Sequence, residues 1–202
     1  ENREMVLESA AVLKKVCLEL GIDLFFKSSF DKANRTSLSP RGVGMNKGLA
    51  ILSEVKETYN LKILTDVHES WQCKPVAEVA DVLQIPAFLA RQTSLLEAAA
   101  QTERIVNIKK GQFMAPWDMK GAINKVRSIN PAAPIWLTER GSSFGYGRLI
   151  VDMTSLVQMR QYGCPIIFDA THSVQQPSNP DGITHGNRMM VRPLMRAALA
   201  VG

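Results

Sequence analysis

The sequence is poor in the features that mark secreted, zinc-binding and membrane proteins. It has three widely separated cysteines, Cys17, Cys73 and Cys164, and no CxxC pair. This argues against a disulfide framework or a zinc knuckle and favours reduced thiols. The chain does not open with a basic and then apolar signal segment, and no apolar run approaches the roughly 18 residues of a membrane span. We therefore expect a cytoplasmic protein with no membrane segment.

Several nucleotide-binding and catalytic signatures are also missing. No GxxxxGK[ST] loop, GxSxG elbow or HExxH pair occurs in the chain. The net charge is +5, but no run of Lys or Arg exceeds two residues, whereas nucleic-acid binding needs a continuous basic face. We expect no nucleic-acid partner, and the mild positive charge suits small acidic ligands. With 46% hydrophobic and 21% charged residues, the composition is that of an ordinary globular protein.

What the sequence does contain is a regular alternation of short apolar runs and helical patterns. The predicted strands are 22–28, 62–67, 81–89, 105–108, 135–138 and 165–168. The predicted helices are 3–20, 45–58, 72–80, 94–102, 116–128, 153–162 and 188–201. No linker interrupts residues 1–202, so we expect one α/β domain with a parallel sheet. A doubly wound open sheet and a (β/α)8 TIM barrel both fit this alternation.

Ionisable side chains gather at the carboxyl ends of the predicted strands. Five of the six strand ends carry them, as Lys27, Asp66-Val67-His68, Lys109-Lys110, Glu139-Arg140 and Asp169-Ala170-Thr171-His172. In a barrel all strand ends converge on one face, whereas in an open sheet only those beside the switch point meet. The shared chemistry of the strand ends therefore favours the barrel.

The richest of these strand ends is the segment 27–37, with Lys27, Lys32 and Arg35 among hydroxyls and Asn34. Lysines and a bidentate arginine are suited to phosphate or carboxylate groups, so we interpret the segment as an anion site. A solvated basic loop is the alternative. The cations at the strand ends could likewise be structural partners of nearby acids, which would join Lys27, Lys109 and Arg140 to Asp66, Glu139 and Asp169. His172 could be a core histidine, an acid/base group or a metal ligand.

Six blocks of this sequence resemble one enzyme family. They are Phe26-Lys27-Ser28-Ser29-Phe30-Asp31-Lys32-Ala33-Asn34-Arg35-Thr36-Ser37, Thr65-Asp66-Val67-His68-Glu69, Pro86-Ala87-Phe88-Leu89-Ala90-Arg91-Gln92-Thr93, Lys109-Lys110-Gly111-Gln112-Phe113, Glu139-Arg140-Gly141-Ser142-Ser143-Phe144-Gly145-Tyr146 and Asp169-Ala170-Thr171-His172-Ser173-Val174-Gln175. In this order they resemble the 3-deoxy-D-manno-octulosonate 8-phosphate (KDO 8-phosphate) synthases. The resemblance spans nearly the whole chain.

The resemblance implies a (β/α)8 barrel and a transferase of lipopolysaccharide precursor biosynthesis. Such an enzyme condenses phosphoenolpyruvate with D-arabinose 5-phosphate and water, releases inorganic phosphate, needs no organic cofactor and is usually a homotetramer. Relative to the family, we expect the chain to lack the first and last strands, so that the barrel domain is incomplete at both ends. Six strands alone would not close a standard eight-stranded barrel.

The resemblance also implies roles for individual residues. Those expected around phosphoenolpyruvate are Lys27, Lys32, Lys109, Gln112, Arg140 and the backbone of Ala87. Those expected to hold the pentose phosphate are Asn34, Arg35 and Thr36, with Arg91 reaching in from a neighbouring subunit and Asp66 near the sugar. The resemblance implies that Lys27, Lys32, Lys109 and His172 are catalytic.

Some features leave alternatives open. In the metal-dependent branch of the family His172 would bind a divalent ion such as Mn, Zn, Fe or Cd, and Thr171-His172-Ser173-Val174-Gln175 looks more like that branch. Thr184-His185-Gly186 replaces the Ser-Gly-Gly of the family. A related synthase using erythrose 4-phosphate, or a non-catalytic barrel that binds sugar phosphates, remains possible.

Overall fold

The computed structural model describes residues 2–33, 41–177 and 183–202, and in these ranges strands and helices alternate. The strands of the main sheet are β1 (Phe25–Lys27), β2 (Lys62–Asp66), β3 (Val82–Ile85), β4 (Ile105–Lys109), β5 (Ile135–Glu139) and β8 (Ile166–Phe168). The helices are α1 (Arg3–Glu19), α2 (Met45–Tyr59), α3 (Cys73–Ala77), α4 (Thr93–Ala100), α5 (Met119–Ile129), α6 (Thr154–Arg160) and α7 (Val191–Val201). The alternation predicted from the sequence is confirmed.

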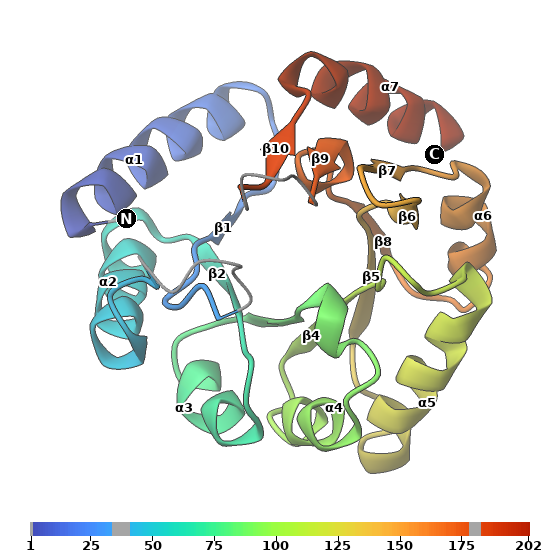
Figure 1. Cartoon of the computed structure of the whole chain (residues 1–202). Helices are drawn as coiled ribbons and strands as arrows, with labels where there is room; N and C mark the ends of the chain where they lie inside the picture. Colours follow the sequence, from blue (N-terminus) through green and yellow to red (C-terminus); the bar gives the residue numbers. More distant parts are fainter. Residues whose placement is uncertain (1, 34–40, 178–182) are drawn as a thin grey trace.

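The sheet is the curved parallel sheet of a (β/α) barrel. Its six strands follow the chain in the order β1-β2-β3-β4-β5-β8, and every pairing is parallel. Figure 1 shows the strands around a central axis and the helices in a ring outside them. Within the described part of the chain, β1 and β8 pair on one side only. The barrel is therefore confirmed over the doubly wound sheet, and its six strands do not close into a full cylinder.

The local sequence explains most element boundaries. Asn2 caps α1 by accepting a hydrogen bond from the Met5 backbone N–H. Pro116 opens a 3₁₀ turn that leads into α5, in keeping with the preference of proline for the first helical turn. The strand predicted at 81–89 is shorter than expected, because the chain after Pro86 turns into a 3₁₀ helix, Ala87–Leu89. This turn presents the backbone of Ala87 at the end of β3.

Two short hairpins were not predicted. β6 (Ser142–Phe144) pairs antiparallel with β7 (Arg148–Ile150), and β9 (Gln175–Gln176) pairs with β10 (His185–Gly186). Both follow strands of the barrel, after β5 and after β8 respectively. They lack the long apolar runs that marked the other strands, since their residues are mostly exposed.

The apolar face predicted along α1 is only half buried. Val6 and Ala10 are buried, whereas Leu13 is 44% and Leu20 65% exposed. The contacts of α1 are mainly with α2. Packing therefore covers the first half of the predicted face and leaves the second half accessible.

Side chains alternate between the two faces of each strand, and this sorts the apolar from the polar groups. Below the polar end of the barrel, Phe25 of β1 meets Trp136 of β5 edge to face, with 5.0 Å between ring centroids. Two residues further along these strands lie Lys27 and Thr138, on the same inner face. An aromatic pair thus lies in the barrel interior beneath a polar layer.

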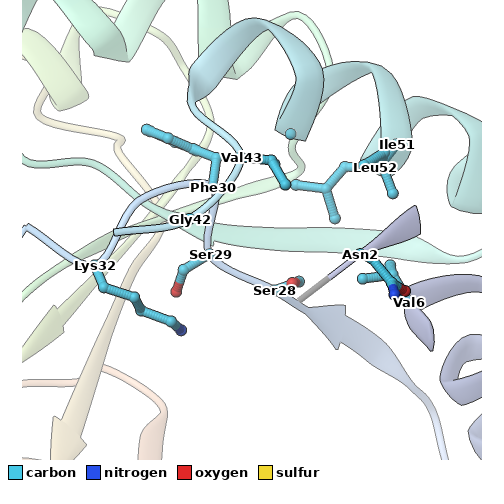
Figure 2. Close-up of a pocket in the computed structure, with 11 residues that line it drawn as sticks. Asn2, Val6, Ser28, Ser29, Phe30, Lys32, Gly42, Val43, Ile51 and Leu52 are labelled. Atoms are coloured by element: carbon cyan, nitrogen blue, oxygen red, sulfur yellow. The ribbon is translucent and has the colours of Figure 1, made fainter. Parts of the chain in front are cut away.

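Phe30 anchors the segment that leaves β1. Its side chain is 2% exposed, and the Gly44 N–H donates to its carbonyl oxygen. Gly48 of α2 lies so close that an added Cβ would be 2.4 Å from the Phe30 Cβ. Figure 2 shows Ser29 and Lys32 on one side of this segment and the apolar side chains of α2 on the other. The absence of a side chain at Gly48 lets the segment pack directly on the helix.

We expect Gly48→Ala to lower the free energy of unfolding by about 1–3 kcal/mol, because the new methyl group would overlap Phe30. Gly121→Ala is the matched control. Gly121 lies in α5 with no atom within 4 Å of the added Cβ, so alanine should raise stability by about 0.5–1 kcal/mol. Urea unfolding measures both values. Equal effects of the two substitutions would show that Phe30 does not restrict position 48.

Candidate active site

A cleft of about 810 Å³ opens at the carboxyl ends of the strands. Of the residues predicted for the site, those that line it are Lys27, Lys32, Asp66, Ala87, Lys109, Gln112, Arg140 and His172. They come from both ends of the sheet and from the strands between, as the barrel geometry predicts. The convergence expected from the sequence is therefore present.

Lys109 and Arg140 form the most deeply buried cationic part of the cleft. They are 7% and 6% exposed. Lys109 Nζ donates to Asp169 Oδ2 at 2.5 Å, and Arg140 Nη2 donates to Gln175 Oε1 at 2.9 Å. Arg140 Nε and Nη1 are buried and have no hydrogen-bond partner within the described ranges. Unpartnered buried N–H groups are costly, so this side of Arg140 is suited to receive an anion.

A second network joins β1 to β2 at the rim. Lys27 Nζ donates to Ser29 Oγ at 2.6 Å, and Ser29 Oγ donates to Asp66 Oδ1 at 2.5 Å. His68 Nε2 lies 3.0 Å from Asp66 Oδ2, and Lys27 Nζ lies 3.2 Å from Oδ1. The ion-pair alternative is thus correct for Lys27 with Asp66 and for Lys109 with Asp169. These same four side chains line or border the cleft, so pairing does not remove them from the site.

Both carboxylates remain ionised in these networks. Burial alone would raise the pKa of Asp66, but the hydrogen bond from His68, the charge of Lys27 and the hydrogen bond from Ser29 hold it well below the usual range. Burial likewise opposes ionisation of Asp169, yet His172 and Lys109 hold its pKa far below the usual range. Both groups can therefore accept hydrogen bonds at neutral pH but cannot donate protons.

The pKa values of the cations Lys109 and Arg140 are also lowered, which for these groups disfavours the charged form. Burial lowers the pKa of Lys109, with Arg140 and Lys27 adding repulsion, and the nearby Asp169 only partly offsets this. Burial also lowers the pKa of the Arg140 guanidinium against the attraction of Asp169 and Glu139. The carboxylates near Lys109 and Arg140 therefore do not fully compensate the burial and mutual repulsion of these cations. An incoming anion would relieve this repulsion, which favours phosphate or carboxylate ligands.

Not every predicted residue reaches this cleft. Arg91 is exposed and does not line it, and its carbonyl accepts a hydrogen bond from Lys125 Nζ at 2.7 Å. The predicted pentose phosphate residues Asn34, Arg35 and Thr36 lie outside the described residues. Their roles remain predictions.

Six polar residues that line the cleft were not assigned to it from the sequence, namely Ser29, Asp31, His68, Gln84, Gln175 and Thr184. Ser29 and His68 belong to blocks that carried the resemblance, and Gln175 follows His172 in another. Gln84 lies within a predicted strand, and its register partners Asp66 and Asn107 show that it shares their face. A strict two-residue alternation could have identified Gln84, whereas the His68–Asp66 contact depends on the turn after β2.

His172 alone does not make a metal site. Its Nδ1 lies 2.7 Å from Asp169 Oδ2, and its side chain is 45% exposed, so Nε2 is the ring nitrogen left for a ligand. Within the described ranges, no group of three His, Cys, Asp or Glu side chains could hold a metal ion. Among the described residues, His172 is therefore a single candidate ligand without the companion ligands of a metal centre.

Comparison with known proteins identifies relatives along the entire chain. Residues 1–202 match the family model described as the DAHP synthetase I family. A protein of Fusobacterium nucleatum is 54% identical over 203 residues, covering 100% of this chain and 73% of the relative. Relatives from Synechococcus sp. (56% identity, 71% of the relative) and Agrobacterium fabrum (54%, 72%) also match this chain over its full length. All three are named 2-dehydro-3-deoxyphosphooctonate aldolase.

We expect inorganic phosphate to bind more weakly as the solution becomes alkaline. Lys109 has a pKa below its ordinary 10.5, so it loses its positive charge at a lower pH than an exposed lysine. Losing this charge-assisted bond should raise the Kd about tenfold or more. Calorimetric titration with phosphate, repeated from neutral pH up to pH 10.5, measures the change in Kd. Lys109→Arg should retain affinity to higher pH, and a wild-type Kd that stays constant up to pH 10.5 would contradict the role of Lys109.

Proposed function

This chain belongs to the DAHP synthetase I family, and from that premise we propose that it is a KDO 8-phosphate synthase. It condenses phosphoenolpyruvate with D-arabinose 5-phosphate and water. The products are 3-deoxy-D-manno-octulosonate 8-phosphate and inorganic phosphate, in the biosynthesis of lipopolysaccharide precursors. The enzyme is a transferase, in agreement with relatives of 54–56% identity that share one enzyme name.

The observation that carries the proposal is the buried cationic pair Lys109 and Arg140. Arg140 offers two unpartnered nitrogens within the described part of the chain, and Lys109 lies where burial disfavours its charge. Phosphoenolpyruvate carries a phosphate and a carboxylate. Its phosphate suits the guanidinium, which can bind two oxygens at once, and its carboxylate suits an ammonium group.

We assign the second substrate to the rim of the same cleft. Lys27 and Lys32 both line it, and the segment that carries them continues into Asn34, Arg35 and Thr36. We assign the phosphoenolpyruvate side to Lys32 with Lys27, and the pentose phosphate to the three residues that follow. The two substrates would then meet near Asp66 and His172.

The reaction is a carbon–carbon bond formation followed by hydration. The enol carbon of phosphoenolpyruvate attacks the aldehyde carbon, and the aldehyde oxygen takes a proton. Water adds at the phosphate-bearing carbon, and the resulting intermediate loses phosphate. Lys109 and Arg140 stabilise the negative charges of this intermediate because they are already oriented in a site of low dielectric.

The proton for the aldehyde oxygen does not come from the acidic side chains. Asp66 and Asp169 have strongly lowered pKa values and hold no proton at neutral pH. The donor is therefore an ammonium group, a histidine of the cleft or water. Asp66 instead accepts a hydrogen bond from a sugar hydroxyl and so orients the pentose.

We also propose a homotetramer in which Arg91 contributes to the cleft of a neighbouring subunit. The exposure of Arg91 and of Phe88, which is 57% exposed at the rim of the cleft, supports this arrangement. Among the described residues, no helix combines the length and the hydrophobicity of a membrane span. The cytoplasmic location predicted from the sequence remains a prediction.

We expect phosphate release from phosphoenolpyruvate when D-arabinose 5-phosphate is present. Erythrose 4-phosphate is the control, because it is the substrate of the related synthases that the sequence left possible. Release with erythrose 4-phosphate alone would assign the chain to those synthases. No release with either sugar from a folded protein would leave only a non-catalytic sugar-phosphate-binding barrel.

We expect a chelator to abolish this activity and Mn²⁺ or Zn²⁺ to restore it, if His172 is a metal ligand as the family resemblance implies. His172→Ala should then bind less metal, measured by equilibrium dialysis and elemental analysis. Full activity in the presence of chelator would assign the protein to the branch of the family that works without metal.

A further inference from the structure

A buried ion pair lies behind the cationic face of the cleft. Lys110 and Glu139 directly adjoin Lys109 and Arg140 in the sequence, so strand alternation turns their side chains to the opposite face of the sheet. Both side chains are 1% exposed, and Lys110 Nζ lies 3.5 Å from Glu139 Oε2. Neither residue lines the cleft. The mechanism proposed above therefore does not use them.

Glu139 holds the backbone where it leaves β5. Its Oε1 accepts the N–H of Arg140 at 2.8 Å and the N–H of Gly141 at 2.5 Å. Its Oε2 accepts the hydroxyl of Ser155, in α6, at 2.6 Å. One carboxylate thus fixes two consecutive peptide groups and ties them to the outer helix. The first of these peptide groups belongs to Arg140 itself.

Lys110 connects the segment after β4 to the segment after β5 that Glu139 holds. Its Nζ donates to the Met114 carbonyl at 3.2 Å and to Ser142 Oγ, in β6, at 3.0 Å. The Ser143 N–H donates to the Gln112 carbonyl at 2.9 Å. The segment after β4, which carries Gln112 into the cleft, is therefore joined to the hairpin that follows β5.

The energetics suggest that this pair does more than stabilise the fold. Removing two charges from water is costly, and apolar residues of similar volume often give equal or greater stability. What apolar residues cannot do is accept two adjacent backbone N–H groups. Arg140 depends on such a constraint, since its guanidinium has a single hydrogen bond to a described residue, Gln175.

We propose that Lys110 and Glu139 are positioning residues that aim Arg140 and Gln112 at the phosphate of the substrate. They act through the backbone turn after β5 and touch no substrate. This turn also requires glycine at position 141. Gly141 has φ +91°, and an added Cβ would lie 3.1 Å from the Leu149 Cβ. The identity of the phosphate-bearing substrate rests on the proposed function, whereas the positioning of Arg140 does not.

Two double variants separate positioning from stability. Both remove the charges of the pair, so neither leaves a buried unpaired ion. Lys110→Met with Glu139→Leu also removes the acceptor of the two N–H groups, and it should raise the KM for phosphoenolpyruvate by up to about 100-fold with a smaller change in kcat. Lys110→Met with Glu139→Gln keeps an acceptor oxygen and should retain a KM within a few-fold of wild type.

The controls distinguish failure of this inference from failure of the proposed function. Lys120→Met, at an exposed position of α5, should leave the KM unchanged. Binding of phosphoenolpyruvate and of inorganic phosphate is measured by calorimetry without turnover. A wild-type protein that binds these anions but does not consume arabinose 5-phosphate would overturn the proposed function alone. A folded leucine double variant with the wild-type KM and phosphate affinity would overturn the positioning role.

A milder variant covers the case in which the leucine variant does not fold. Ser155→Ala removes one hydrogen bond to Glu139 Oε2 and leaves the ion pair in place. We expect it to raise the KM or the Kd for phosphate about threefold, with a circular dichroism spectrum like that of wild type. Unchanged affinity in this variant would likewise count against positioning through Glu139.

Discussion

The alternation of side chains along parallel strands is the constraint on which this site depends. Lys109 and Lys110 are adjacent in the chain, yet one faces the cleft and the other lies buried behind it. The same rule separates Arg140 from Glu139. Because the register joins β4 directly to β5, the two inward cations become neighbours, and so do the two outward groups. A shift of one residue would turn the cleft-facing cations away from the cleft and bring the buried ion pair toward it.

The electrostatics of the cleft follow from this sorting. Each inward carboxylate is held ionised by an adjacent cation and by neutral or histidine donors, as seen for Asp66 and Asp169. Burial nevertheless disfavours the charged forms of Lys109 and Arg140. Arg140 also lies close enough to Lys109 to lower the pKa of Lys109. The positive charges of Lys109 and Arg140 therefore repel each other without a bound anion. Binding of an anion becomes favourable through the relief of this repulsion.

Much of this could be predicted from the sequence, because the strands are apolar runs whose carboxyl ends are polar. That pattern identified the barrel and the convergence of Lys27, Lys109, Arg140 and His172. It could not identify the β6–β7 hairpin, which has no apolar run and is held by contacts with the Gln112 segment. Nor could it show that the second half of α1 lies open, since a helical period indicates an apolar face and not what covers it. The sequence could not decide between structural and ligand-binding roles for the lysines, because Lys27 and Lys109 each pair with a carboxylate and also line the cleft.

The packing of Phe30 against α2 connects an outer helix of the barrel to the side chains at the rim of the cleft. Ser29 takes part in the network at the rim, and its neighbour Phe30 packs against a glycine of an outer helix. A substitution at position 48 would thus affect activity even though this position lies outside the cleft. Directed evolution of substrate preference could use α2 as an adjustable support, moving the segment 29–32 by changing what it rests on.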